Sequence, residues 1–222
     1  MCCCMQATLQ AERTAAAAAI ASRYTQQLHA DLGKLRHCTF ETLDRARPLA
    51  PISWNGKSFS EQEQRKALVK ALGIARDFDP QGIEGLFFYG PPGSGKSHLA
   101  AAIVNAACAT GVPARYGTVS SLLRLVQDGF SDGSASQRLE ALINCPLLVI
   151  DDLGTENTTQ WSEMTLFELV TGRDNAERPT IYTSNYPVDQ LNDPRIRSRI
   201  KGSCTCIELV ISDYRALRQA SL

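Results

Sequence analysis

The chain has 222 residues, and its 23 lysines and arginines balance its 23 aspartates and glutamates, so the formal net charge is zero. This balance excludes a protein that holds nucleic acid or an anionic membrane by bulk positive charge alone. Apolar residues make up 44% of the chain, which is typical of a soluble protein with a packed core. No apolar run reaches the ~18 residues of a membrane-spanning helix, so we expect a cytoplasmic protein without a membrane partner.

Eight cysteines raise the question of a zinc site. Cys2, Cys3 and Cys4 are adjacent and cannot easily all reach one tetrahedral ion, and no Cys-x-x-Cys pair follows them. Reduced, buried or idle thiols are therefore expected, with zinc as the minor alternative. Cys204 and Cys206 would share one face of a predicted strand and are expected in the core.

The first 50 residues are expected to form a helical extension and a linker. Helix-forming residues with a moderate apolar stripe run to about residue 37, and the helix is expected to end near Gly33. The segment from about His37 to Lys57 contains Pro48 and Pro51 and predicts a linker or a strap that lies on the following domain.

From Ser60 onward, helical patterns alternate with short apolar runs. Helices are predicted at 61–78, around 99–107, and at 121–127, 137–143 and 163–174. Strands are predicted at 86–89, 114–118, 147–150, 180–183 and 207–211. This alternation predicts a three-layer α/β fold with a mainly parallel sheet.

A glycine-rich loop follows the first of these strands directly. Its residues, which match GxxxxGK[ST] in full, are Gly90, Pro91, Pro92, Gly93, Ser94, Gly95, Lys96 and Ser97. Glycines let successive N–H groups face phosphate oxygens, and the next helix, which carries His98 beside the loop, adds its positive N-terminal dipole. Lys96 would neutralise phosphate charge and Ser97 would bind Mg²⁺. A surface turn that fits by chance is the weaker alternative, because both flanks have the required structure.

Two later strands end in polar residues that could complete this site. The run 147–150 ends in Asp151, the predicted metal ligand, and Asp152, which could orient or activate the attacking water. Asn185 follows the run 180–183 and could hydrogen-bond water or the γ-phosphate. Taken alone, the two acids could cap a strand, and Asn185 could be a turn residue before Pro187. Together with the loop, they predict a nucleoside triphosphatase that uses ATP and Mg²⁺.

Four basic residues lie close together at Arg195, Arg197, Arg199 and Lys201. On a helix, Arg195 and Arg199 share a face and Arg197 points elsewhere. An arginine presented to the γ-phosphate of a neighbouring subunit can stabilise the transition state. The alternatives are a solvated basic face or contacts with the DNA backbone, for which Arg197 and Lys201 are the better candidates.

These segments, in this order, resemble the DnaC/DnaI-type replicative-helicase loaders, which share the AAA+ fold with the IstB-type transposition ATPases. The resemblance covers about residues 38–218. It rests on CTFETLD at 38–44, GPPGSGKSHLAAA at 90–102, LVIDDLGTE at 148–156, PTIYTSNY at 179–186, RIRSRI at 195–200 and DYR at 213–215. The loop is generic to P-loop proteins, whereas DDLGTE and RIRSRI narrow the family considerably.

The resemblance implies a partner-docking extension at 1–50 and an AAA+ P-loop NTPase domain at 51–222. It implies that residues 90–97 are Walker A, Asp151 and Asp152 Walker B, Asn185 the first sensor, Arg199 a trans-acting arginine finger and Arg215 a second sensor. Two departures matter. Many AAA+ ATPases have Glu where Asp152 stands, and the residues after Ser184, 185–222, are too few for a full helical lid domain, which weakens the assignment of Arg215.

The resemblance leads us to expect an ATPase that delivers a DnaB-type replicative helicase to single-stranded DNA. It would act as an ATP-dependent homo-oligomer with weak turnover in the absence of partner or DNA. An IstB-like transposition helper, acting on DNA with a transposase, is the alternative. A nucleotide-binding adaptor that hardly hydrolyses ATP is a third possibility, and the sequence discriminates poorly among them.

Overall fold

The computed structural model describes residues 22, 24–155 and 159–214, and a five-stranded sheet forms its centre. The sheet contains β3 (Gly85–Tyr89), β4 (Ala114–Thr118), β5 (Leu147–Leu153), β6 (Thr180–Ser184) and β7 (Cys204–Glu208). The spatial order is β4-β5-β6-β3-β7, and every neighbouring pair is parallel. The carboxyl ends of β3, β5 and β6 therefore meet at one edge, which is where ligands bind in sheets of this kind.

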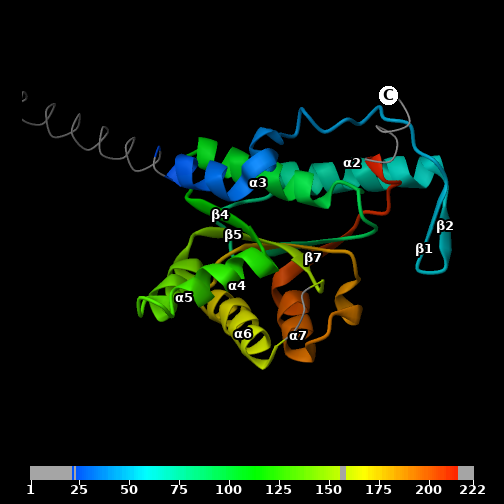
Figure 1. Ribbon diagram of the computed structural model, residues 1–222. Helices are drawn as coiled ribbons and strands as arrows, with labels where there is room; N and C mark the ends of the chain where they lie inside the picture. The colour runs from blue at the N-terminus through cyan, green and yellow to red at the C-terminus, as the bar shows by residue number, and fades with distance from the viewer. Residues whose placement is uncertain (1–21, 23, 156–158, 215–222) are drawn as a thin grey trace, which may run out of the picture.

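Helices cover both faces of the sheet, which gives the three layers that the sequence predicts (Figure 1). One face carries α2 (Glu61–Asp77) and α3 (Lys96–Ala109). The other carries α4 (Val119–Asp128), α5 (Ala135–Asn144), α6 (Gln160–Asn175) and α7 (Pro194–Ser203). Short 3-10 helices lie at η1 (Gly33–His37) and η2 (Val188–Gln190). None of the helices in the described part of the chain is long and apolar enough to cross a membrane.

Local sequence signals explain where several elements begin. Ser60 and Glu63 form a capping box at the start of α2, in which the Glu63 carboxylate accepts from the Ser60 N–H at 2.8 Å. Asp193 caps α7, whose first residue is Pro194. A hairpin that the sequence analysis missed, β1 (Ile52–Trp54) with β2 (Lys57–Phe59), turns at Asn55 and Gly56. That dipeptide favours this type of turn.

The last strand differs from its prediction. β7 begins at Cys204, so Cys204 and Cys206 lie in a strand as expected, but it ends at Glu208 rather than at residue 211. The expectation that Cys206 is in the core is wrong, because this residue is exposed. Ile207, Leu209, Val210 and Ile211 are buried, whereas Glu208 is exposed, and after Glu208 the chain leaves the ladder. The N–H of Leu209 then donates to the Tyr89 carbonyl at 2.7 Å, which takes the chain across the end of β3.

The described part of the N-terminal extension packs on the domain itself. Residues 24–32 are helical and end at Gly33 (φ 53°), as predicted. Leu28 and Leu32 are buried in the same cluster as the alanines of α3, and Asp31 forms an ion pair with Arg115 of β4 at 2.5 Å. The predicted helix before residue 22 and the cysteines at 2–4 lie outside the described residues.

A fully buried arginine holds the second layer to the sheet. Arg173 of α6 donates to the carbonyls of Leu142, Ile143, Cys145 and Pro179 and to the Thr180 hydroxyl, at 2.7–3.1 Å. Burial lowers the pKa of Arg173 to about 10. One guanidinium therefore satisfies backbone oxygens from the end of α5 and from the segments that lead into β5 and β6.

The Arg173→Ala variant should lower the free energy of unfolding by about 3 kcal/mol or more, because several buried carbonyls lose their donor together. Urea unfolding followed by circular dichroism measures this change. Arg178→Ala, at an exposed position on the next loop, is the matched control and should stay within about 0.5 kcal/mol of the unmodified chain. Equal effects of the two substitutions would contradict this account of Arg173.

Candidate nucleotide-binding site

The predicted glycine-rich loop joins β3 to α3 in a tightly curled conformation. Gly93 and Gly95 have left-handed φ values of 73° and 109°. A Cβ at Gly93 would fall 1.8 Å from the Asp213 carboxylate, and one at Gly90 would fall 2.2 Å from the Leu209 carbonyl oxygen. Both close packing and backbone conformation therefore favour glycine at positions 90 and 93. The curled loop leads directly into the first turn of α3.

Lys96 lies at the centre of the loop and is 5% exposed. Its ammonium donates to the carbonyls of Gly90 and Pro91 at 2.8 and 2.9 Å and to the Asn185 side-chain oxygen at 3.0 Å. These three acceptors are neutral, so a phosphate oxygen would offer the ammonium stronger, charge-assisted hydrogen bonds. Lys96 and Asn185, distant in sequence, are thus in direct contact.

Asp151 is the point at which three elements meet. Its Oδ1 accepts hydrogen bonds from the hydroxyls of Ser97 (2.8 Å) and Thr183, and its Oδ2 accepts one from Tyr116 (2.6 Å). Burial and the neighbouring Asp151 raise the pKa of Tyr116 well above its ordinary value, so the phenol keeps its proton and donates. Tyr116 and Thr183 are contacts that the sequence analysis did not identify.

Asp152 points away from that buried cluster. The pairing of β5 with β6 is irregular between Ile150 and Leu153, and Asp152 has a left-handed φ of 60° and an exposed side chain. Its N–H donates to the Thr183 hydroxyl at 3.1 Å. As a result of this irregularity, the two adjacent acids have different surroundings. Asp151 is buried among hydroxyls, whereas Asp152 lines a pocket.

This pocket has a volume of about 440 Å³, within the range of ligand sites. Lys96, Ser97, His98, Asp152 and Asn185 line it together. Its other lining residues are Leu35, Thr42, Leu43, Asp44, Arg47, Pro92, Gly93, Gly95 and Tyr214. The structure thus brings eight of the predicted site residues to one cavity, because Pro92, Gly93 and Gly95 of the loop line it as well, while Asp151 contacts the cavity through Ser97.

The outer wall of the pocket is the segment 38–50, which we call the strap and which lies on the domain as predicted. The His98 ring nitrogen Nε2 is 2.8 Å from the Thr39 carbonyl oxygen and 3.3 Å from the Thr42 hydroxyl. Arg47 donates to the Ser94 carbonyl of the loop at 3.1 Å, and its guanidinium lies 5.2 Å from the centre of the Tyr214 ring. None of the site residues predicted from the sequence lies in the strap, and no motif marks Arg47.

The four basic residues on and beside α7 lie away from this pocket. Arg195 and Arg199 both face α6, so they share a face as expected. The Arg195 guanidinium lies 4.0 Å from the centre of the Phe167 ring, and Arg199 forms an ion pair with the Asp174 carboxylate at 2.7 Å. Arg197 donates to the Asp189 carbonyl at 2.8 Å, and Lys201 forms an ion pair with the Asp189 carboxylate. Arg199 does not line the pocket of its own chain, and Arg215 lies outside the described residues.

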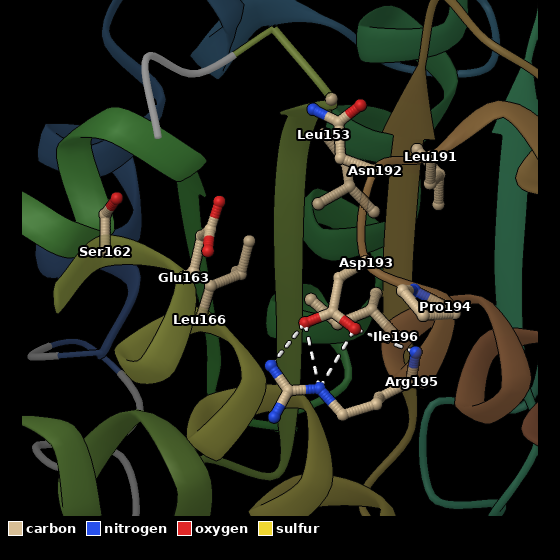
Figure 2. A pocket seen from close by; sticks show the side chains of 11 residues that line it. Leu153, Ser162, Glu163, Leu166, Leu191, Asn192, Asp193, Pro194, Arg195 and Ile196 are labelled. Atoms are coloured by element: carbon tan, nitrogen blue, oxygen red, sulfur yellow. Dashed lines mark hydrogen bonds and ion pairs between the residues drawn. The ribbon is translucent and has the colours of Figure 1, made fainter. Parts of the chain in front are cut away.

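A second pocket, of about 260 Å³, lies between β5, α6 and the start of α7 (Figure 2). Leu153, Leu166, Leu191 and Ile196 form its apolar part. Asp193 and Arg195 pair at its rim at 2.7 Å, as the dashed lines in Figure 2 mark. Among the residues that the structure describes, Gly154 is the single glycine that lines this second pocket, whereas the glycine-rich loop opens into the 440 Å³ pocket, which therefore fits a nucleotide.

The oxygen atoms of the first site suit magnesium. Ser97 and Asp151 offer a hydroxyl and a carboxylate, which are the ligand types that Mg²⁺ takes in phosphate sites, and Mg²⁺ needs few protein ligands there. Zinc has no comparable site: within residues 22, 24–155 and 159–214, no group of three or more His, Cys, Asp or Glu could hold a metal ion. The described cysteines are free thiols.

The parallel sheet, the glycine-rich loop after β3 and the acids at the end of β5 define a P-loop α/β fold of the AAA+ type. The crystal structure of the DnaC helicase loader superposes with a TM-score of 0.61 at 23% identity, covering 81% of this chain and 99% of that one. The model of the IstB-like ATP binding protein family matches residues 58–196, and the chain belongs to this family.

Two curated relatives carry different names. The replicative helicase loader DnaC of Escherichia coli (strain K12) is 33% identical over 130 residues, 58% of this chain and 53% of that protein. A putative ATP-binding protein in an insertion sequence of Mycobacterium tuberculosis is 32% identical over 119 residues, 54% of this chain and 47% of that protein. The matched segments thus span about half the length of these relatives. The predicted resemblance is confirmed at the level of the family.

The Gly93→Ala variant should lose at least about 10-fold in affinity for ATP, since its methyl group displaces the loop from Asp213 and strains the backbone. Titration with a fluorescent ATP analogue measures this. Gly111→Ala is the matched control, because Gly111 also has a left-handed φ, of 86°, but nothing lies within 4 Å of its added methyl. A similar loss in both variants would mean that backbone strain alone, rather than the loop contact, is responsible.

Proposed function

We propose that this protein binds and hydrolyses ATP with Mg²⁺ and uses the change of nucleotide state to hold and release a macromolecular partner. One observation carries the proposal: Lys96, Ser97, Asp152 and Asn185 line one pocket, and the buried carboxylate of Asp151 joins them through Ser97. The family to which the chain belongs is one of ATP-binding proteins.

Each residue has a role that its position supports. The ammonium of Lys96 would bind the terminal phosphates, and Ser97 with Asp151 would hold magnesium, which when bound neutralises phosphate charge. Asp152, exposed to the pocket, would accept a proton from the attacking water, and Asn185 would orient that water or the γ-phosphate. The strap residues Leu43 and Arg47 would then enclose the remainder of the nucleotide.

Two substitutions separate binding from hydrolysis. Lys96→Ala should abolish ATP binding, whereas Asp152→Asn should keep the affinity and lower turnover at least about 100-fold, because an amide cannot accept the proton. Fluorescent-analogue titration and phosphate release measure the two quantities. Asp128→Asn, at the exposed end of α4, is the control and should change neither.

If the unmodified chain binds ATP but releases no phosphate with DNA and partner present, it is an adaptor that acts by nucleotide occupancy. That outcome would contradict the hydrolysis proposed here.

For the partner, we propose a DnaB-type replicative helicase, delivered to single-stranded DNA by an ATP-dependent homo-oligomer in which Arg199 reaches the nucleotide of the next subunit. The similarity to a replicative helicase loader supports this proposal. The strap supports it physically, because it contacts the loop through Arg47 and α3 through His98, and it continues into the helix 24–32 of the extension. Nucleotide binding and a partner on residues 1–50 would therefore act on one continuous segment.

Removal of residues 1–21 should weaken capture of a DnaB-type helicase at least about 10-fold and leave ATP affinity unchanged, because it removes docking surface and no residue of the pocket. Removal of all of 1–50 is unsuitable, since Leu28, Leu32, Leu43 and Leu49 belong to the core. A pull-down with matched ATP titrations makes the comparison. Undiminished helicase capture by the shortened chain would contradict the docking role of these residues.

The second candidate is an IstB-like transposition helper. The family model and the insertion-sequence relative favour it. Such a protein would assemble with ATP on duplex DNA and activate a transposase. Mass measurement with ATP, in the presence of either the helicase or duplex DNA, discriminates between the two functions. A helicase loader should form a complex with the helicase, whereas a transposition helper should form one with duplex DNA.

A further inference from the structure

We propose that Tyr116 is a positioning residue for the metal-binding end of the nucleotide site, and that its hydroxyl holds Asp151 in the orientation in which this carboxylate works together with Ser97. The inference rests on the proposed use of Mg²⁺ and ATP. It assigns a role to a strand, β4, that carries no recognised motif.

The position of Tyr116 follows from the sheet. In the parallel pairing of β4 with β5, Tyr116 lies opposite Val149 and Thr118 lies opposite Asp151, so the long side chain of Tyr116 extends along the strand toward the acid. The phenol oxygen is 2.6 Å from Asp151 Oδ2, and the residue is 5% exposed. Phenylalanine would fill the same space, so packing alone does not account for the hydroxyl.

The three hydroxyls around Asp151 divide the carboxylate between them. Ser97 and Thr183 both donate to Oδ1, whereas Tyr116 donates to Oδ2. A carboxylate has about four acceptor positions, so three hydroxyls leave room for about one further contact. Tyr116 therefore fixes the end of the carboxylate that the other two hydroxyls do not hold.

Tyr116 is also the hydroxyl that can be removed with the least side effect. Ser97 is a predicted metal ligand, and Thr183 additionally accepts the N–H of Asp152. Loss of the Tyr116 hydroxyl leaves the hydrogen bonds from Ser97 and Thr183 to Oδ1 in place. It removes the donor to Oδ2 and the contact of the phenol with the Ser97 side chain, both at the metal-binding end of the site. The change should therefore appear in the use of magnesium and hardly at all in the binding of nucleotide without metal.

The test compares Tyr116→Phe with Tyr182→Phe. Tyr182, on β6 two strands away, is slightly more buried (3% exposed) and lies in the core cluster of the other face of the sheet. Binding of a fluorescent ADP analogue is measured first in EDTA and then across a Mg²⁺ titration. A thermal melt checks that each variant is folded, and Tyr116→Met serves as a second variant with a flexible apolar side chain.

For Tyr116→Phe, the Mg²⁺ concentration that gives half of the affinity increase should rise at least about 10-fold, as is typical when a group that orients a metal ligand is lost. Affinity in EDTA should stay within about twofold, and Tyr182→Phe should leave the Mg²⁺ midpoint unchanged. The inference is overturned if Tyr116→Phe and Tyr116→Met have the same Mg²⁺ midpoint as the unmodified chain. It is also overturned if their midpoint equals that of Tyr182→Phe. If Mg²⁺ has no effect on the unmodified chain, the proposed function itself fails.

Discussion

The carboxylate of Asp151 and its three hydroxyl donors hold the nucleotide site together. A buried charge is tolerated only where donors replace the lost water, and here they come from α3, β4 and β6. Each donor lies on a different element. The hydrogen bonds to Asp151 therefore fix the positions of the phosphate loop, the strand that carries the acids and the strand that precedes Asn185 relative to one another. The site is therefore organised by the fold before any ligand is present, which limits the cost of ordering it on binding.

The strap extends this organisation outward. It forms a wall of the 440 Å³ pocket on one side, and on the other it continues into the helix 24–32, which packs on α3. Arg65 of α2 donates to the carbonyls of Arg45 and Arg47 at 2.9 and 3.2 Å, so the strap is held from a second helix as well. The strap, which belongs to the proposed docking region 1–50, thus lines the nucleotide pocket itself, and this shared segment is the physical basis for proposing that the pocket and the docking region respond to each other.

Much of the fold could be predicted, because its signals are local. The loop at 90–97 is contiguous, and the acids and Asn185 follow apolar runs directly, so the shared edge of a parallel sheet brings them together. Tyr116 could not be predicted in the same way, because its contact with Asp151 depends on β4 lying beside β5 in one particular register. Arg47 is 47 residues from its partner Ser94. The end of β7 was misjudged because apolar residues continue to Ile211, although the chain leaves its pairing with β3 after Glu208.

The left-handed turn at position 152 bears on why an aspartate stands at the exposed acidic position of β5. Among residues with a side chain, aspartate and asparagine enter this backbone region most readily, whereas longer side chains do so at a cost. The bend in β5 thus favours aspartate over glutamate at this position, although Glu177 of the same chain adopts a similar φ of 52°. A glutamate would gain reach by one methylene but would oppose the turn that directs the carboxylate into the pocket, so side-chain length and strand shape at this position are coupled and would have to change together.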